Sequence, residues 1–430
     1  MCELETKMIK KHYLSISLVL GVISVLYGCG GGSGSTDDGT SSTSETSSSG
    51  PITSFGSIYV NGKRYDTSNS EVYVEDESSD ESELRVGMMV EVVEDDSGNA
   101  ARVSYDDDLE GIVAANNIAA GSSIGTLEVM GQTVTVDNKT VFETYVAAIS
   151  SVDLIVAGNI VEVSGYTTSD STITATRIEV KAVDLATYLS NYPKGIEVKG
   201  IVSQHSASAN TFKLGLLVVN YAGAILDDLG NGVQDNLYVE VKSVQGMNAS
   251  DQLIASKVEL EDNGRRDYSG DDGDEYEVKG YVTALSADSI TVNEETFIIN
   301  NVTEFEDDSK GKIKVGDMVE VEGYVNSDGR LTAKEIELED SDDSNEIKGT
   351  VASVVIDIDN NGTITLSDNT VIKVTNNTLM HDERDEGFTP DKTFNLADIS
   401  SGDYIEVYAI DNGDGTFTAT KIEREDIPNP

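Results

Sequence analysis

The sequence predicts an all-β protein made of tandem small five-stranded Greek-key barrels of the OB type, placed behind an N-terminal signal peptide and a flexible tether. Short stretches of alternating apolar and polar residues are separated by Gly, Asn and Asp turns. Val, Ile and Thr are frequent, and the 430 residues include 39 Gly, 5 Pro and no Trp, a composition typical of strands and turns. A phrase centred on Val-Glu-Val, or a close variant of it, occurs five times.

The N-terminal residues predict a lipoprotein signal peptide over residues 1–28. Met1 and Met8 are both candidate starts, and Lys10 and Lys11 precede an apolar stretch that is too short for a comfortable transmembrane span. The stretch ends in Leu-Tyr-Gly-Cys at residues 26–29, which resembles the bacterial lipobox. A plain signal peptide and a signal anchor are the alternatives.

The resemblance implies cleavage before Cys29, a diacylglycerol on its thiol and acylation, for example with palmitate, on its new amine. Gly30 follows the cysteine, and the resemblance then implies sorting to the outer membrane, on the periplasmic side or on the cell surface. Residues 29–50 contain almost only Gly, Ser, Thr and acidic residues, so they predict a flexible tether of roughly 25 Å.

The five phrases are centred on glutamates about 80 residues apart, longer than the 20–50 residues of solenoid repeats, so each unit has room for its own core. We therefore predict five β repeats joined by polar linkers and one short helix. The predicted segments are repeat 1 (51–108, shorter and expected to be incomplete), repeat 2 (109–181), a helical linker (182–194), repeat 3 (195–262), an acidic linker (263–275), repeat 4 (276–340), a linker (341–345) and repeat 5 (346–426).

Repeat 4 shows the predicted strand order most clearly. "YEVKGYVTAL" predicts the first strand, "ITVNEETFIIN" the next two, a polar crossover with one helical turn follows, and "MVEVEGYV" and "LTAKEIEL" predict the last two. Gly316 fits a turn with positive φ before the fourth strand. In the last strand the apolar alternation slips by one residue between Ala333 and Ile336, and the same slip recurs in repeats 2, 3 and 5, which predicts a β-bulge.

"GPITSFGSIYVNGKRYDTS" (50–68), followed by "ELRVGMMVEV" (83–92), resembles the start of the bacterial lipoprotein repeat known as domain of unknown function five-six-six-six. Proteins of that family carry tandem small barrels behind a lipobox and a Gly/Ser tether. The resemblance covers nearly all of residues 50–425, and it implies an architecture but no activity.

One stretch resembles a calcium-binding loop. "DIDNNGTITLSD" (357–368) places candidate oxygen ligands at positions typical of such a loop. The candidate calcium ligands are Asp357, Asp359, Asn361, Thr363 and Asp368. The flanking stretches predict strands rather than helices, so the other interpretation is a β-hairpin turn built on Asn-Gly, with no cofactor at all.

Other motifs predict no catalysis. "GSSIG" (121–125) has the spelling of a nucleophile elbow around Ser123, but the strand and helix that an elbow needs are not predicted around it. His12, His205 and His381 fall in different parts of the chain. The Val-Glu-Val glutamates alternate out of a core strand, so a solvated face is expected for them.

The net charge of −49 excludes most nucleic-acid partners, because phosphates would be repelled. The sequence therefore favours a non-enzymatic, outer-membrane-anchored spacer or binding module with a membrane anchor and an unknown protein or glycan partner. The alternative is a calcium-binding adhesion or matrix protein that uses acidic turns, and a hydrolase is a remote third.

Overall fold

The structure is a computed structural model, and it describes the compact unit that runs from Thr43 to Pro430, beginning at Thr46. The described residues are 46–427 without 76, 96, 108, 170, 262–274, 293–294, 307–310, 327–329, 339–344, 358–360, 385–393 and 413–414. The signal peptide, Cys29 and most of the predicted tether and linkers lie outside them.

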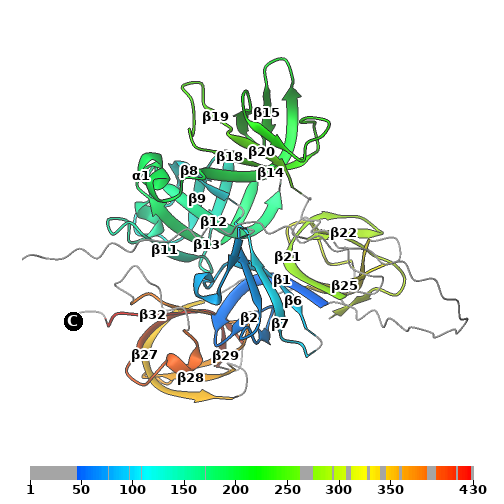
Figure 1. Cartoon of the computed structure of the whole chain (residues 1–430). Coiled ribbons are helices and arrows are strands. Elements are labelled where there is room, and N and C mark those ends of the chain that lie inside the picture. Colours follow the sequence, from blue (N-terminus) through cyan, green and yellow to red (C-terminus); the bar gives the residue numbers. More distant parts are fainter. Residues whose placement is uncertain are drawn as a thin grey trace, which may run out of the picture. The chain divides into compact units, whose positions relative to one another are not determined.

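The strands follow one another in five similar sets (Figure 1). Repeat 1 contains β1 (Thr46–Phe55), β2 (Ile58–Val60), β3 (Lys63–Tyr65), β4 (Glu71–Val74), β5 (Glu77–Ser79), β6 (Met89–Glu94) and β7 (Ala100–Tyr105). Repeat 2 contains β8 (Leu109–Asn116), β9 (Gly125–Val129), β10 (Gln132–Val136), β11 (Val141–Thr144), β12 (Ile160–Ser169) and β13 (Thr172–Ala182). Helix α1 (Leu185–Asn191) follows, within the predicted helical linker.

The last three sets repeat the same order. Repeat 3 contains β14 (Ile196–Ser206), β15 (Thr211–Leu214), β16 (Leu217–Asn220), β17 (Ile225–Asp227), β18 (Tyr238–Ser243), β19 (Gln252–Ile254) and β20 (Lys257–Leu260). Repeat 4 contains β21 (Glu275–Leu285), β22 (Ser289–Val292), β23 (Glu295–Ile298), β24 (Glu304–Phe305), β25 (Met318–Val325) and β26 (Leu331–Leu338). Repeat 5 contains β27 (Asn345–Ile356), β28 (Gly362–Leu366), β29 (Val371–Val374), β30 (Leu379–Asp382), β31 (Tyr404–Asp411) and β32 (Thr416–Glu425).

Repeat 5 shows how a set closes into a barrel. The antiparallel ladders β29–β28, β28–β27, β27–β31 and β31–β32 form the wall, and the parallel ladder β29–β32 closes it. This is the OB order, in which the first strand pairs with the second and the fourth, and the third pairs with the fifth. The short β30 adds to the outer edge of β32. The predicted fold class, all-β with small five-stranded barrels, is confirmed.

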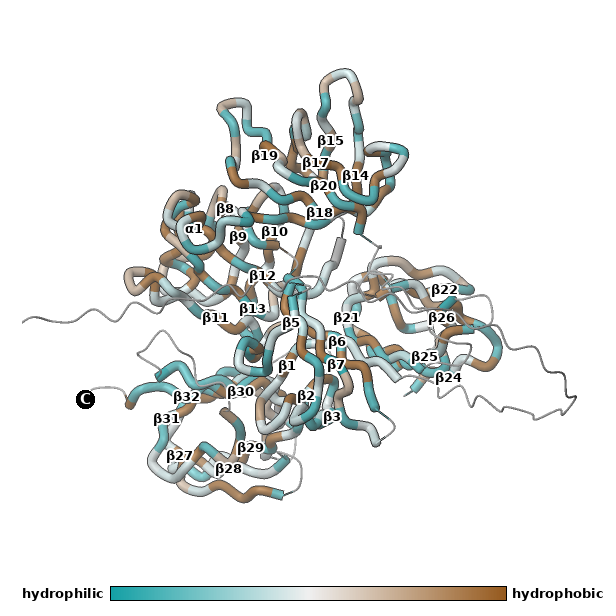
Figure 2. Tube along the Cα trace, in the orientation of Figure 1, coloured by the Kyte–Doolittle hydropathy of each residue, from teal (hydrophilic) through white to brown (hydrophobic). Residues whose placement is uncertain are grey.

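The cores lie inside these barrels. In repeat 4, Val278, Ile290, Phe297, Val319 and Ile336 are fully buried in one cluster. Buried and partly buried residues alternate along β21 and β25, as the period of a half-buried strand requires, and Figure 2 shows brown hydrophobic residues mixed with teal hydrophilic ones in the barrel strands. Repeats 1 and 5 have clusters of their own, whereas the buried residues of repeats 2 and 3 join in a single cluster.

Repeat 1 differs from its prediction in where it begins and in which strands it contains. Thr46–Gly50, predicted as tether, belong to β1, because their backbone pairs with β6 on one side and with β21 of repeat 4 on the other. A Ser/Thr-rich segment carries no apolar alternation that would reveal such a strand. The repeat contains every strand of the set, but among the described residues no ladder joins β3 to β7, so its wall lacks the closing pair of repeat 5.

The predicted bulge is present in the last strand of repeats 2, 4 and 5. Pairing with the fourth strand skips Thr176, Lys334 and Thr420 in turn, each directly after an alanine. In repeat 1 the skip is at Ala101. In repeat 3 the last strand is divided into β19 and β20 at the same place. The fourth strand pairs with the last strand on both sides of this extra residue. The other edge of the last strand pairs with the third strand before the bulge and with a short crossover strand after it, as β29 and β30 do with β32.

A buried hydroxyl supports each bulge. Thr140, Thr303 and Thr378 each donate a hydrogen bond of 2.8 Å to the carbonyl of the alanine before the bulge. Ser70 makes the equivalent bond to Ala100 at 2.6 Å in repeat 1. The three threonines are at most 7% exposed, so these carbonyls have little access to water.

The turn before the fourth strand requires a left-handed residue. Gly87, Gly158, Gly316 and Gly402 have φ between 86° and 101° there, which confirms the prediction for Gly316. Repeat 3 uses Asn236, with φ 70°, at the equivalent place, and asparagine tolerates this region better than most residues.

Neighbouring sets are joined through their backbones. β8 of repeat 2 pairs with β14 of repeat 3 at Glu110–Glu197 and Leu109–Val198, and β1 pairs in parallel with β21. Helix α1, capped by Asp184, fills the connection between repeats 2 and 3. Among the described residues, no helix has the length and apolar composition needed to span a membrane.

We predict that Thr378→Val destabilises repeat 5, because it removes the donor to a buried carbonyl while keeping the side chain's volume. The expected loss is about 1–3 kcal/mol. It would be measured as faster hydrogen exchange of β31 and β32 amides and a lower melting temperature. Thr296→Val, on an exposed position of β23, is the matched control and should change neither. Equal effects of the two substitutions would contradict the role given to the bulge hydroxyl.

Candidate functional site

Those predicted calcium ligands that the structure describes do not come together around one ion. Asp357 and Asn361 frame the tight turn between β27 and β28, where the Asp357 amide donates to the Asn361 carbonyl at 2.8 Å. Asp359 lies outside the described residues. Thr363 is a paired residue inside β28, opposite Val355. The stretch is thus a β-hairpin, the other interpretation that the sequence allowed.

Asp368 lies in the next turn, at the far end of β28, where its carboxylate accepts a hydrogen bond of 2.9 Å from the Thr370 amide. That bond lowers the pKa of Asp368. A five-residue strand separates Asp357 from Asp368, about 17 Å at the rise of a β-strand, whereas ligands of one Ca²⁺ lie within about 5 Å of each other.

Ser123 lies on the exposed loop between β8 and β9 rather than on a turn between a strand and a helix. His205 is in repeat 3, where its Nε2 lies 2.7 Å from the Tyr221 hydroxyl. His381 is in β30 of repeat 5, buried opposite Glu423. The structure places these three residues in different repeats and assembles no nucleophile and base from them.

The expectation of a solvated face for the Val-Glu-Val glutamates is wrong. Glu91, Glu162, Glu240 and Glu406 are between 4% and 9% exposed, and only the Glu320 side chain, at 21%, is half-buried. They point away from their own cores but are covered by long side chains of neighbouring strands. Buried carboxylates need counter-charges, so the surroundings of these residues decide what the outer faces can bind.

A lysine on the first strand lies opposite this glutamate in repeats 3, 4 and 5, and it forms the ion pair in repeats 4 and 5, whereas Glu240 of repeat 3 pairs with Lys242 at 3.0 Å. Lys199, Lys279 and Lys348 each precede a glycine, and each lies directly opposite its Val-Glu-Val glutamate. The Lys348–Glu406 and Lys279–Glu320 ion pairs measure 2.6 Å and 3.7 Å. The repeated Lys-Gly in "EVKG", "EVKG" and "EIKG" was the signal in the sequence that could have revealed this pairing.

Repeat 2 breaks the rule. Its equivalent position is Glu110, before Gly111, so a glutamate faces Glu162 where the later repeats have a lysine. Five glutamates then occupy directly opposite positions across β11, β13, β12, β8 and β14. This glutamate ladder consists of Glu143, Glu179, Glu162, Glu110 and Glu197. Like charges at such positions repel each other.

Three cations neutralise most of the ladder. Arg177, 2% exposed, lies 2.6 Å from both Glu143 and Glu179. Lys181 lies 2.6 Å from Glu162 and 3.0 Å from Glu179. Burial opposes the ionisation of Glu179, but the charges of Lys181 and Arg177 outweigh it and hold its pKa at about 2.

Lys242 pairs with Glu197 at 2.6 Å at the other end of the ladder, which leaves Glu110 between two carboxylates. Glu110 accepts a hydrogen bond from the Tyr188 hydroxyl through Oε2, while its Oε1 has no partner among the described residues. Burial raises the pKa of Glu110 to about 8, and the charge of Lys181 opposes this only in part.

A smaller unneutralised site lies in repeat 4. Glu277 on β21 lies opposite Glu322, and its Oε1 is buried without a hydrogen-bond partner among the described residues. Burial, followed by the charge of Glu320, raises the pKa of Glu277 to about 7. The folded protein thus prefers this carboxyl protonated near neutral pH.

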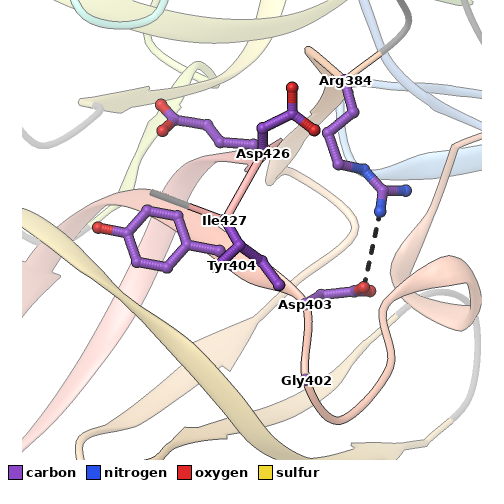
Figure 3. A pocket seen from close by; sticks show the side chains of 7 residues that line it. Arg384, Gly402, Asp403, Tyr404, Asp426 and Ile427 are labelled. Carbon is purple, nitrogen blue, oxygen red and sulfur yellow. Dashed lines mark ion pairs between the residues drawn. The ribbon is translucent and has the colours of Figure 1, made fainter. Parts of the chain in front are cut away.

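Figure 3 shows a cleft of about 410 Å³ at the end of repeat 5. Its lining consists of Arg384, Gly402, Asp403, Tyr404, Glu425, Asp426 and Ile427. Arg384 is engaged by Asp382 at 3.0 Å and by Asp403 at 3.8 Å, so the one cation of the lining is already paired. The cleft is an open, acidic depression rather than an apolar pocket of the kind that encloses small organic ligands.

The repeated barrels also match known proteins. Four segments, residues 49–99, 110–179, 279–337 and 348–423, match the family described as Domain of unknown function (DUF5666), and together they cover more than half of the chain. The chain belongs to this family. The DUF5666 segments coincide with repeats 1, 2, 4 and 5 and leave out repeat 3, the set with the divided last strand and with asparagine in place of the turn glycine.

No curated protein matches the DUF5666 chain. Among solved structures, one titled "drosophila Unr CSD456" matches 54% of this chain and 97% of its own at 15% identity, with a TM-score of 0.14. A score this low supports no argument from that structure. The outer-face carboxylates must therefore be interpreted from their own surroundings.

We predict that Lys279→Glu destabilises repeat 4, because it recreates the glutamate pair of repeat 2 without Lys181 beside it. Adding Glu320→Lys reverses the pair and should recover most of the loss, which is expected to be roughly 1–3 kcal/mol. Urea denaturation of the single and double variants measures both. If the double variant is no more stable than Lys279→Glu alone, the two side chains are not coupled.

We predict that Glu277→Gln stabilises the protein at pH 8 but not at pH 5. The folded pKa, about 7, lies above the unfolded value of 4.5, so the folded state holds the proton more tightly. Stability is therefore lost as pH rises from about 4.5 to 7, and glutamine avoids that loss, which is roughly 3 kcal/mol at pH 8. Melting temperatures in EDTA at both pH values measure it, with exposed Glu304→Gln as the control. A pH-independent effect would refute the assignment.

Proposed function

We propose that this DUF5666 protein is a non-enzymatic lipoprotein that is anchored in the outer membrane through acylated Cys29. Its barrels would act there as a spacer and as a binding module for an envelope or extracellular partner. Support for the anchor comes from the lipobox-like residues 26–29 behind a short basic and apolar segment. Residues 30–45 separate Cys29 from the first strand of the barrels.

The observation that carries the proposal is that the residues shared by the repeats have structural roles. The bulge alanine and its threonine, the turn glycine and the Lys–Glu pair all close barrels or cover their outer faces. The backbone ladders β8–β14 and β1–β21 then join separate sets into one unit. Such a chain extends a surface away from an anchor, and what it binds is set by the residues that the repeats do not share.

The charge of the chain restricts the partner. A net charge of −49 favours a cationic protein or a neutral glycan and disfavours phosphate-rich polymers. Binding to a cationic protein would weaken as salt rises, because exposed charges separated by more than about 8–10 Å are screened at physiological ionic strength. Pull-down from intact cells at low and high salt would distinguish a cationic protein from a neutral glycan.

We predict that Cys29→Ser abolishes acylation and leaves an uncleaved precursor. Metabolic labelling with radioactive palmitate and fractionation of inner and outer membranes measure both effects. The wild-type chain should carry the label in the outer-membrane fraction, and Cys2→Ser is the matched control that should behave like it. A Cys29→Ser chain that is cleaved normally and remains membrane-bound would refute the anchor but not the binding role of the barrels.

A further inference from the structure

Three carboxylates converge beside the end of the glutamate ladder. Glu75 lies in the turn between β4 and β5, Asp107 precedes β8, and Glu197 is on β14. One carboxylate oxygen of each lies within 4.8 Å of those of the other two. Local geometry holds them there, because the Asp107 amide donates to Glu75 Oε1 at 2.9 Å and the β8–β14 ladder fixes Glu197 opposite Glu110.

Two carboxylate oxygens of this trio are buried without a hydrogen-bond donor among the described residues. Asp107 Oδ1 and Glu197 Oε1 have no hydrogen-bond partner in the part of the chain that the structure describes, and the residues are 3% and 7% exposed. The other Glu197 oxygen is satisfied by Lys242 at 2.6 Å, so Oε1 is the one left for the cluster. A buried carboxylate oxygen without a partner is costly, and it indicates a missing positive ligand.

The charge balance supports the same conclusion. In repeat 2, Glu110 occupies the position that a lysine occupies in repeats 3, 4 and 5. Glu110 Oε1 is also without a hydrogen-bond partner among the described residues. Lys199 lies directly opposite Glu240 of its own repeat, and its charge also interacts with Asp107 and Glu75, so it offsets part of the negative charge of the cluster. The carboxylates of Glu75, Asp107, Glu197 and Glu110 thus lie close together at this end of the ladder.

We propose that Glu75, Asp107 and Glu197 bind one calcium ion where repeats 1, 2 and 3 meet. Oxygens that bind the same Ca²⁺ at 2.3–2.6 Å are at most about 5 Å apart, which agrees with the observed separation. The donors of the cluster are three carboxylates, the hard oxygen ligands that calcium prefers.

Calcium fits better than magnesium because its 6–8 ligands tolerate irregular geometry, and water would complete the set, whereas magnesium demands a near-ideal octahedron. The ligands come from a turn of repeat 1, the connection to repeat 2 and a strand of repeat 3. The bound ion fastens the three sets to one another. This inference does not depend on the lipid anchor, and it uses none of the residues of the 357–368 hairpin.

The test uses the full chain, purified in detergent and freed of metal with EDTA. Isothermal titration with CaCl₂ should show one ion with a dissociation constant between about 10⁻⁵ and 10⁻³ M, and saturating calcium should raise the melting temperature by several degrees. Asp107→Asn and Glu197→Gln should each weaken binding at least about tenfold and remove that rise. In EDTA, Asp107→Asn should melt no lower than the wild-type chain, because it removes one of several crowded, buried carboxylates.

Matched controls separate a built site from diffuse attraction to an acidic surface. Glu259→Gln alters a second trio, Glu240, Glu259 and Glu261, whose oxygens are equally close. Asp368→Asn alters a calcium ligand that was predicted from the 357–368 stretch. Both should bind calcium like the wild-type chain. Glu75→Gln, at a half-buried position, provides a further ligand variant if Glu197→Gln fails to fold. The proposal is overturned by the absence of binding up to 10 mM calcium, or by binding that survives in Asp107→Asn or is lost equally in Glu259→Gln.

Discussion

The structure depends on how the last strand of each set divides its hydrogen bonds. That strand pairs with the fourth strand along one whole edge. Along its other edge it pairs with the third strand before the bulge and with a short crossover strand after it, so it has to bend between the two. The extra residue after Ala175, Ala333 or Ala419 supplies the bend, and a buried threonine satisfies the carbonyl exposed by it. Cores of mostly Val, Ile and Leu then fill whatever volume the closed wall leaves.

The outer faces of the closed barrels vary between repeats, and charge pairing decides which glutamates can be buried there. A Val-Glu-Val glutamate on the fourth strand is tolerable when a lysine of the first strand lies opposite, as in repeats 3 to 5. Repeat 2 has exchanged that lysine for Glu110 and relies on Lys181 and Arg177, which arrive from its last strand. The exchange places an extra carboxyl group beside Glu75, Asp107 and Glu197, which come from repeats 1 and 3 and from the connection to repeat 2.

The sequence predicted those features that depend on neighbouring residues in the chain. The slip between Ala333 and Ile336, the positive φ of Gly316 and the barrel order all follow from periodicity and turn chemistry. Burial of Glu162 was missed, because the side chains that cover it come from other strands and the register between strands is not written in any one of them. Thr46–Gly50 were missed for a related reason, since a strand held from both sides by backbone ladders needs no apolar alternation.

The position of β1 has a mechanical consequence. It lies between β6 and β21, so the segment that connects the barrels to the N-terminus enters a central strand rather than an edge. Tension on Thr46 along the chain runs parallel to β1, and the hydrogen bonds of both ladders would share that load in shear instead of opening one at a time. A protein held by its N-terminus against flow or a moving partner would therefore resist separation of this strand from its two neighbours.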